Sequence, residues 1–293
     1  MNKKILITGG AGFIGYHLSK KLLESDYHID IADNFSRGVE DTFIKTLSNN
    51  SKINLINVDL LDSNSIKLFS NSYENIYHLA AVIGVKHVIQ SPKDVLNKNF
   101  VLLKNVLDIG MKQKNLKRFS FTSTSEVYAG TLNYYGLDFP TKEETPLTIN
   151  LLSNARTTYM LSKIYGEAMC LHSGLPVTVV RPHNFYGPRM GLSHVIPELM
   201  QKIINTNTNI IDVYSVNHKR TFCYISDAVS MIKLITESEK SVGKVYNIGS
   251  QDEEITMGSL AQKIIKLIGK DCVVNPLPSI SGSPERRMPS MLE

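Results

Sequence analysis

Short runs of apolar, often β-branched residues alternate along the chain with longer amphipathic stretches. The runs lie at about residues 3–8, 28–33, 53–58, 75–80, 116–122 and 177–181. Runs of this length that are apolar at consecutive positions are typical of strands buried on both faces of a sheet. The stretches between them favour helices. This alternation predicts an α/β fold, a Rossmann-type doubly wound parallel sheet.

The regular alternation breaks up beyond residue 182. Helical patterns follow at 194–205, 226–237 and 256–268, and strand patterns at 211–216 and 245–248. We therefore expect residues 1–182 to form a dinucleotide-binding Rossmann domain. Residues 183–293 should form mainly a smaller mixed α/β substrate-binding portion, with some segments returning to the first domain. Such a portion would cover the carboxyl ends of the strands, where open α/β sheets bind ligands.

A glycine pattern stands between the first predicted strand and its helix. Gly9, Gly12 and Gly15 are spaced so that the first permits a tight turn, the second lets a diphosphate approach the backbone, and the third lets helix and strand pack closely. Phe13 and Ile14 open the helix and join the expected cofactor contacts. The motif predicts a dinucleotide site.

The second predicted strand ends at a carboxylate, Asp33, about twenty residues past the glycines, where it can bind the adenosine ribose hydroxyls. Its charge would repel a 2′-phosphate, so NAD is favoured over NADP. Asn34 and Arg37 follow in the same loop and are further expected cofactor contacts. Arg37 would weaken the discrimination between the two dinucleotides.

Tyr159 and Lys163 lie four positions apart in a predicted helix over residues 155–171, so both point the same way. The ammonium group and a positive nicotinamide ring would both favour the phenolate and lower the pKa of Tyr159. The tyrosine is then the expected base for a sugar hydroxyl. Thr124 follows the strand at 118–122, where its hydroxyl can bind the oxygen being oxidised.

Composition and charge exclude several other classes of protein. The chain has 293 residues, 42% of them apolar, and a net charge of +5 without blocks of one sign, which gives no case for nucleic acid. Its three cysteines are far apart and have no metal-ligand spacing, so we expect no metal site. No apolar run has the length of a signal peptide or a membrane span. We expect a cytoplasmic protein that does not associate with membranes.

These motifs together resemble the extended short-chain dehydrogenase/reductase family, in its branch of nucleotide-sugar epimerases, dehydratases and decarboxylases. The resemblance runs nearly end to end, and the segments that carry it include TGGAGFIG at residues 8–15 and Arg181–Arg189. It implies NAD as the cofactor and a transient oxidation of a nucleotide-sugar at C4. The cofactor contacts that it implies are Asp59 at the adenine, Leu60, Leu79, Ala80 and Ala81 beneath the cofactor, Asn99, and His183 beside the nicotinamide.

Glu126 bears on the net reaction, because a carboxylate near the oxidised sugar can remove a proton or assist a group to leave. The Ser125-Glu126 pair is similar to that of nucleotide-glucuronate decarboxylases, whereas 4,6-dehydratases carry Asp-Glu there. Ala129 departs from the family pattern by inserting a residue before Gly130. Epimerisation, dehydration and decarboxylation stay open, and Glu126 could instead be structural.

The resemblance also implies the contacts to the substrate, most simply a UDP-sugar. Arg220 and Arg287 resemble arginines that bind its diphosphate, since planar guanidinium groups suit phosphate oxygens. The other expected substrate contacts are Val85, Lys86, Ser125 and Asn184.

Relatives pair as homodimers through the two helices that contain Asn99 and Tyr159. The apolar positions Val101, Leu102, Val106, Tyr165 and Met169 fit that arrangement, although they could equally face the sheet. Two other interpretations stay open: an NAD(P)H-dependent ketone reductase of the same superfamily, and a non-catalytic dinucleotide-sensing protein.

Overall fold

The computed structural model describes residues 3–279 and 284–291. Within these residues the main sheet has seven strands in the order β11-β6-β5-β4-β1-β2-β3, and all neighbouring strands are parallel. The prediction of a doubly wound parallel sheet is confirmed. The strands are β1 (Lys4–Thr8), β2 (His28–Asp33), β3 (Ile53–Asn57), β4 (Tyr73–His78), β5 (Arg118–Thr122), β6 (Val177–Pro182) and β11 (Lys244–Ile248).

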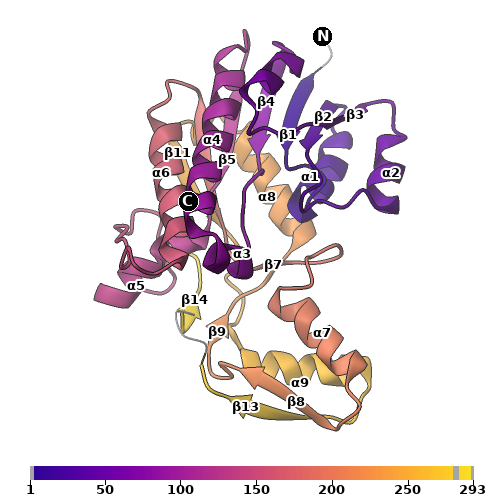
Figure 1. Ribbon diagram of the computed structural model, residues 1–293, viewed down its shortest axis with the longest axis vertical. Helices are drawn as coiled ribbons and strands as arrows, with labels where there is room; N and C mark the ends of the chain where they lie inside the picture. Colours follow the sequence, from indigo (N-terminus) through magenta and orange to yellow (C-terminus); the bar gives the residue numbers. More distant parts are fainter. Residues whose placement is uncertain (1–2, 280–283, 292–293) are drawn as a thin grey trace.

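Alternate residues of the central strand β1 supply two separate cores, one on each face of the sheet. Ile5 and Ile7 point to the face covered by α1 (Phe13–Leu23) and α8 (Ile225–Glu237). Leu6 points to the opposite face, covered by α4 (Pro92–Met111) and α6 (Arg156–Leu171). Figure 1 shows these helices beside the sheet. Burial on both faces explains why the strands read as continuous apolar runs.

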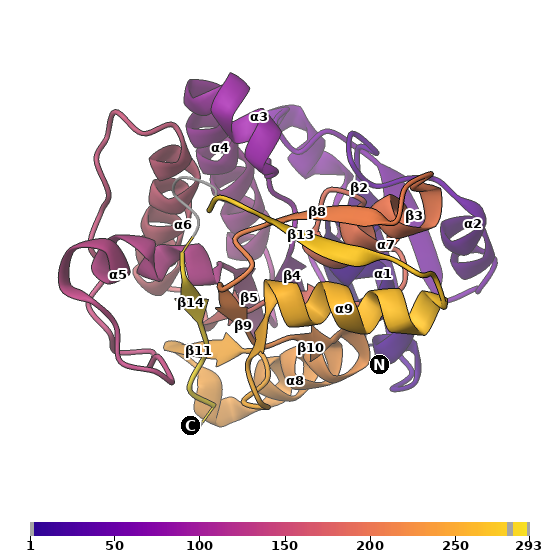
Figure 2. The ribbon, with the colours of Figure 1, turned by 90° about the horizontal axis from the view of Figure 1, so that it is seen from below.

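Shorter elements connect the strands at the rim of the sheet. They are α2 (Thr42–Ser48), α3 (Val85–Gln90), α5 (Ala129–Tyr135) and the 3₁₀ turns η1 (Ser63–Leu68), η2 (Ser125–Tyr128) and η3 (Glu239–Ser241). In Figure 2, α5 projects from the side of the molecule that carries α6.

A smaller portion with its own core lies beyond one end of the sheet (Figures 1 and 2). Helices α7 (Val195–Asn205) and α9 (Met257–Ile268) pack against the parallel pair of β8 (Ile210–Tyr214) and β13 (Val273–Leu277). Two-residue strands link it to the rest of the chain: β7 (Phe185–Tyr186) pairs with β10 (Cys223–Tyr224), and β9 (Lys219–Arg220) pairs with β12 (Ile255–Thr256) and β14 (Arg286–Arg287).

The chain crosses back to the large sheet after entering the smaller portion. Helix α8 packs on α1, and β11 pairs with β6 at the edge of the main sheet. Residues 183–293 are therefore split between the two cores. In the part of the chain that the structure describes, no helix combines the length and the apolar composition needed to cross a membrane.

Candidate active site

The carboxyl ends of the central strands bring the predicted site residues to one edge of the sheet. Gly9 follows β1, Asp33 ends β2, Leu79 follows β4, Thr124 lies just beyond β5 and His183 follows β6. Because parallel strands all end at the same edge, residues that are far apart in sequence meet here. The smaller portion lies beyond this edge in Figure 1.

The glycine loop after β1 has the shape that a dinucleotide diphosphate requires. Gly9 has φ +68°, and a Cβ on it would lie 2.7 Å from the backbone nitrogen of Ala80. A Cβ on Gly15 would lie 2.5 Å from the Cα of Gly10, so the start of α1 packs directly on the loop. A Cβ on Gly12 would meet only the Gly9 carbonyl oxygen, at 3.2 Å, and no side chain caps α1 there. Its first backbone N–H groups are therefore available to phosphate oxygens, and the loop fits NAD.

Asp33 is held in place by the backbone. One carboxylate oxygen accepts a hydrogen bond from the Ala11 N–H at 3.0 Å and the other accepts one from the Phe35 N–H at 2.9 Å. Burial raises the pKa of Asp33, while these backbone donors act in the opposite direction. The following Asn34 accepts a hydrogen bond from the Ser36 N–H at 3.1 Å.

Arg37 lies at an exposed position of the loop after β2. Burial lowers the pKa of His194, and the positive charge of Arg37 lowers it further. The charge of Arg37 also acts to lower the pKa of Tyr159. Arg37 thus faces the site from the loop after β2, but its effect on the choice between NAD and NADP stays a prediction.

The loop after β4 is fixed by Asn99 of α4. Its side-chain oxygen accepts a hydrogen bond from the Val82 N–H at 2.7 Å, and its amide nitrogen donates to the Val82 carbonyl and to the Ser162 hydroxyl, both at 3.1 Å. This ties Leu79, Ala80 and Ala81 to α6. Asn99 therefore supports the loop that was expected beneath the cofactor.

Asp59 and Leu60 follow β3 at the outer end of the same edge. The Asp59 carboxylate accepts a hydrogen bond from the Leu61 N–H at 3.0 Å, and Leu60 is buried, its carbonyl bonded by Asn105 at 2.7 Å. The exposed Asp59 lies on the sheet edge beyond Asp33, and its contact with adenine stays a prediction.

Helix α6 presents Tyr159 and Lys163 to the end of β5. Lys163 is buried and donates a hydrogen bond to the Thr122 carbonyl at 2.7 Å. Thr124 forms a hydrogen bond with the Tyr159 hydroxyl and also accepts one from the Glu126 N–H at 3.2 Å. The structure thus brings together Tyr159, Thr124 and Glu126.

The pKa of Tyr159 is raised, whereas the sequence led us to expect that neighbouring charges would lower it. Burial raises the pKa of Tyr159, as does the Glu126 carboxylate, while Thr124, Arg37 and Arg287 oppose the rise. Lys163 contacts a carbonyl, and burial lowers its own pKa to about 8. Two charges were expected to lower the pKa of Tyr159. The Lys163 ammonium is not among the charges that lower it in this structure. The charge of the nicotinamide ring would be added only when the cofactor binds.

Glu126 is ion-paired with arginines from distant parts of the chain. The Arg287 guanidinium lies 2.5 Å from its carboxylate, and that of Arg156 lies 3.7 Å away. Burial favours the neutral acid, but Arg287 and then Arg156 outweigh it and hold the pKa of Glu126 below its usual value. Sequence reasoning missed this partnership, because 161 residues separate Glu126 from Arg287.

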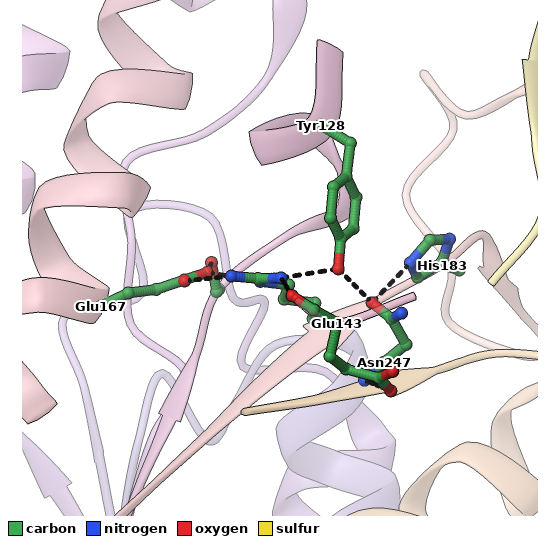
Figure 3. A network of polar contacts seen from close by, with 7 residues as sticks. Tyr128, Glu143, Glu167, His183 and Asn247 are labelled. Carbon is green, nitrogen blue, oxygen red and sulfur yellow. Dashed lines mark hydrogen bonds and ion pairs between the residues drawn. The ribbon is translucent and has the colours of Figure 1, made fainter. Parts of the chain in front are cut away.

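A buried polar network connects η2, α6 and β6 (Figure 3). Glu167 forms an ion pair with Arg181 at 2.6 Å and accepts a hydrogen bond from Ser123 at 2.5 Å. Arg181 also donates to the Tyr128 hydroxyl at 2.6 Å. Sequence reasoning missed Glu167, although a carboxylate on the buried face of a helix is a signal that a cation must lie nearby.

The other residues expected to contact the substrate differ in their burial and in their hydrogen-bond partners. Arg220 is buried, and it donates to three backbone carbonyls, those of Lys219, Pro284 and Glu285, at 2.5–3.1 Å. It thereby holds the start of the segment that carries Arg287. Ser125 is buried at the start of η2. Asn184, with φ +45°, donates to the Thr221 carbonyl at 3.1 Å.

Val85 and Lys86 begin α3, but their side chains lie outside what the structure describes. Their contacts with substrate stay predictions. Arg286, which adjoins Arg287, turns away from Glu126 and forms an ion pair with Glu254 at 2.6 Å. Neighbouring arginines thus have different partners.

A brace connects the loop after β7 to the glycine loop. Arg189 pairs with Asp41 at 2.9 Å, donates to the Ala11 carbonyl at 3.3 Å and stacks on the Tyr16 ring at 4.5 Å. The side chain of His17 in α1 hydrogen-bonds the Pro188 carbonyl at 2.9 Å. This contact between segments far apart in sequence was also missed.

Comparisons with known proteins show which family the chain resembles. The chain is 35% identical to a UDP-N-acetyl-alpha-D-glucosaminuronate decarboxylase of Bacillus cytotoxicus, over 91% of this chain and 81% of the relative. It is 28% identical to UDP-glucuronic acid decarboxylase 6 of Arabidopsis thaliana, over 99% of this chain and 81% of that one.

Among solved structures, UDP-glucuronic acid 4-epimerase of Bacillus cereus, in complex with UDP-glucuronic acid and NAD, is similar with a TM-score of 0.78. It is 27% identical, and the match covers 98% of this chain and 90% of that one. The family model described as "NAD dependent epimerase/dehydratase family" matches residues 5–249. The chain belongs to the NAD-dependent epimerase/dehydratase family.

Proposed function

We propose that this protein is an NAD-dependent decarboxylase of a UDP-linked uronic acid. The observation that carries the proposal is the ion pair of Glu126 with Arg287 beside the Tyr159 hydroxyl. A base for oxidation and a cation for a carboxylate are the two elements that such a reaction needs. The names of the two decarboxylase relatives support the same choice.

The first step is the oxidation of the sugar at C4. Tyr159 takes the proton of the C4 hydroxyl as a phenolate, the form that the positive charge of bound NAD would favour, and Thr124 orients that oxygen through its hydroxyl. Bound NAD would lie along the glycine loop and Asp33, and it supplies the hydride acceptor and afterwards the hydride donor. Lys163, buried in the same helix as Tyr159, donates to the Thr122 carbonyl and so holds the end of β5 that leads to Thr124.

The second step follows from the chemistry of a 4-keto uronate. The C6 carboxylate is then β to a ketone, so breaking the C5–C6 bond releases CO₂ and moves the electron pair into the C4 carbonyl as an enolate. A proton delivered to C5 restores the ketone. In this proposal Arg287 exchanges Glu126 for the C6 carboxylate, and the released Glu126 relays a proton from solvent to C5.

Product analysis across UDP-sugars tests the proposal. We expect the protein with NAD to release CO₂ from a UDP-uronate and to give a UDP-pentose or its 4-keto form by mass spectrometry. Loss of water from UDP-glucose, or a uronate epimer of unchanged mass, would reject decarboxylation and assign the chain to another branch of the family. Reduction of a simple ketone with NADPH, without binding of UDP-sugars, would favour the reductase interpretation.

We further propose that the protein is a cytoplasmic homodimer that pairs through α4 and α6. Phe100 and Tyr165 are 37% and 48% exposed on these helices, with ring centroids 5.5 Å apart. Leu102 and Val106, considered for the same role, are buried against the sheet instead, and Met169 packs on the same core. Light scattering should give a dimer, and the double change Phe100→Glu, Tyr165→Glu should give a monomer. The matched control Met200→Glu, at a 42% exposed position of α7, should stay dimeric.

A further inference from the structure

One face of α6 contacts three adjacent residues at the end of β5. Three polar side chains, four positions apart, project from this face of the helix: Tyr159, Lys163 and Glu167. Their partners are, in the same order, the Thr124 hydroxyl, the Thr122 carbonyl and the Ser123 hydroxyl. The helix that carries the expected base is thus bonded to the strand end that carries the orienting hydroxyl.

The helix also lies directly on the side chains of β5. A Cβ on Gly166 would lie 2.6 Å from Cζ of Phe121, so a larger residue would not fit without a shift. This packing determines how far the helix stands from the strand. Hydrogen bonds are directional and weaken steeply when they are misaligned. The polar contacts at residues 122–124 therefore determine where the end of the strand lies along the helix.

Ser123 is held from two directions. Within the sheet, its backbone N–H donates to the Val180 carbonyl of β6 at 2.8 Å. Toward the helix, its hydroxyl donates to the Glu167 carboxylate at 2.5 Å. Arg181 fixes that carboxylate with two further bonds, at 2.9 and 2.6 Å (Figure 3). Because Ser123 is only 3% exposed, water does not compete for its hydroxyl.

We infer that Ser123 is a positioning residue for the oxidation at C4. Its hydroxyl ties the residue next to Thr124 to the helix that carries Tyr159, and so sets the distance between the two groups that bind the reacting oxygen. A displacement of about 1 Å in such a site can slow a reaction about 10²-fold. The inference rests on the proposed function only for the choice of substrate, because oxidation at C4 begins epimerisation, dehydration and decarboxylation alike.

The change Ser123→Ala removes this bond without leaving a charge unpaired, since Glu167 keeps both bonds from Arg181. The assay follows the reduction of bound NAD after rapid mixing with UDP-glucuronate and, in turn, UDP-N-acetylglucosaminuronate. We expect the rate at saturating sugar to fall about tenfold, with an unchanged half-saturating concentration and NAD content. The matched control is Ser120→Ala in the same strand. That buried hydroxyl has no partner among the described residues, so the wild-type rate should persist.

A double-mutant cycle separates positioning from a general loss of structure. Thr124→Val removes the orienting hydroxyl and should slow the reduction about 10²-fold. If Ser123 acts through Thr124, adding Ser123→Ala to this variant should slow it less than about threefold further, whereas independent effects would multiply. Full multiplication would overturn the inference. So would a Ser123→Ala rate equal to that of the wild type or of Ser120→Ala, or a loss of NAD from Ser123→Ala.

Release of CO₂ tests the proposed function separately. A wild type that reduces NAD with these sugars but releases no CO₂ would reject decarboxylation, while the rates of NAD reduction would still decide the role of Ser123. A wild type that reduces NAD with neither sugar would reject both proposals.

Discussion

Tyr159 is the residue on which the oxidation step depends. Replacing it with Phe removes the hydroxyl while keeping the ring, so we expect turnover to fall about 10²- to 10⁴-fold, as for a lost general base. The NAD content should not change, because the glycine loop and Asp33 are untouched. Tyr165→Phe, in the exposed part of the same helix, is the matched control and should keep its turnover. A Tyr159→Phe enzyme with near-normal product formation would contradict the assignment.

Arg287 and Arg286 offer a comparison of adjacent residues with the same charge. Arg287 pairs with Glu126, and Arg286 pairs with Glu254. We expect Arg287→Gln to lower CO₂ release about 10²-fold, which corresponds to about 2.7 kcal/mol of lost transition-state stabilisation. Arg286→Gln should change it less than about threefold.

The same substitution should also move the pH profile. Arg287 is one of the charges that hold the pKa of Glu126 below its usual value, so its removal raises that pKa. The acid limb of the profile should shift to higher pH in Arg287→Gln and stay in place in Arg286→Gln. A parallel fall in both variants would mean that the whole segment, and not the pair with Glu126, matters.

At the scale of elements, the Glu167–Arg181 ion pair joins α6 to β6. Both side chains are almost completely buried, so Glu167→Gln would leave the Arg181 charge without its partner. We expect the free energy of unfolding to fall by about 3–5 kcal/mol in urea titrations. The exposed pair of Glu198 with Lys202 provides the control, and Glu198→Gln should cost less than about 0.5 kcal/mol.

The strands and long helices could be predicted from sequence because each is specified locally. Consecutive apolar residues in β1 and β6 and helical spacing in α4 and α7 need no knowledge of the rest of the chain. The two-residue strands that join the portions, such as β9 and β14, have no periodicity to detect. Their pairing depends on residues that meet only after the whole chain has folded.

The candidate site shows the same contrast between positions that the local sequence specifies and partners that meet only in the folded chain. The ends of β1, β2 and β5 placed Gly9, Asp33 and Thr124 correctly at one edge, because strand polarity determines that edge. The partners of these residues could not be predicted, since an ion pair such as Arg287 with Glu126 depends on packing between distant segments. The backbone partners of Arg220 illustrate the same limit, because residues 284 and 285 are far from it in sequence, while its contact with a phosphate stays a prediction.

At the scale of the whole molecule, two buried histidines make stability sensitive to acid. Burial lowers the pKa of His78 and of His183 to about 3, from an ordinary 6.5. Between these values the unfolded chain binds protons that the folded chain does not, so stability rises with pH and is lost as pH falls below 6.5. At pH 5 each histidine should contribute a loss of about 2 kcal/mol.

Urea titrations from pH 7 to pH 5 check this expectation. The wild type should lose about 4 kcal/mol over that range from the two groups together. His78→Gln should lose only about half as much, because one of the two groups is gone. A wild-type stability that does not change over the same range would show that one or both rings are protonated in the folded protein.

The Arg189 brace has a consequence for how the molecule can move. Through Asp41 and the Ala11 carbonyl it ties the loop after β7 to the glycine loop, where the diphosphate is expected to bind. We expect a bound dinucleotide to leave slowly, because its release would require the glycine loop to shift against these bonds, whereas a sugar nucleotide that binds toward the smaller portion would not disturb them. NAD would then stay bound over many turnovers, reduced and reoxidised in place, while substrates bind and products leave.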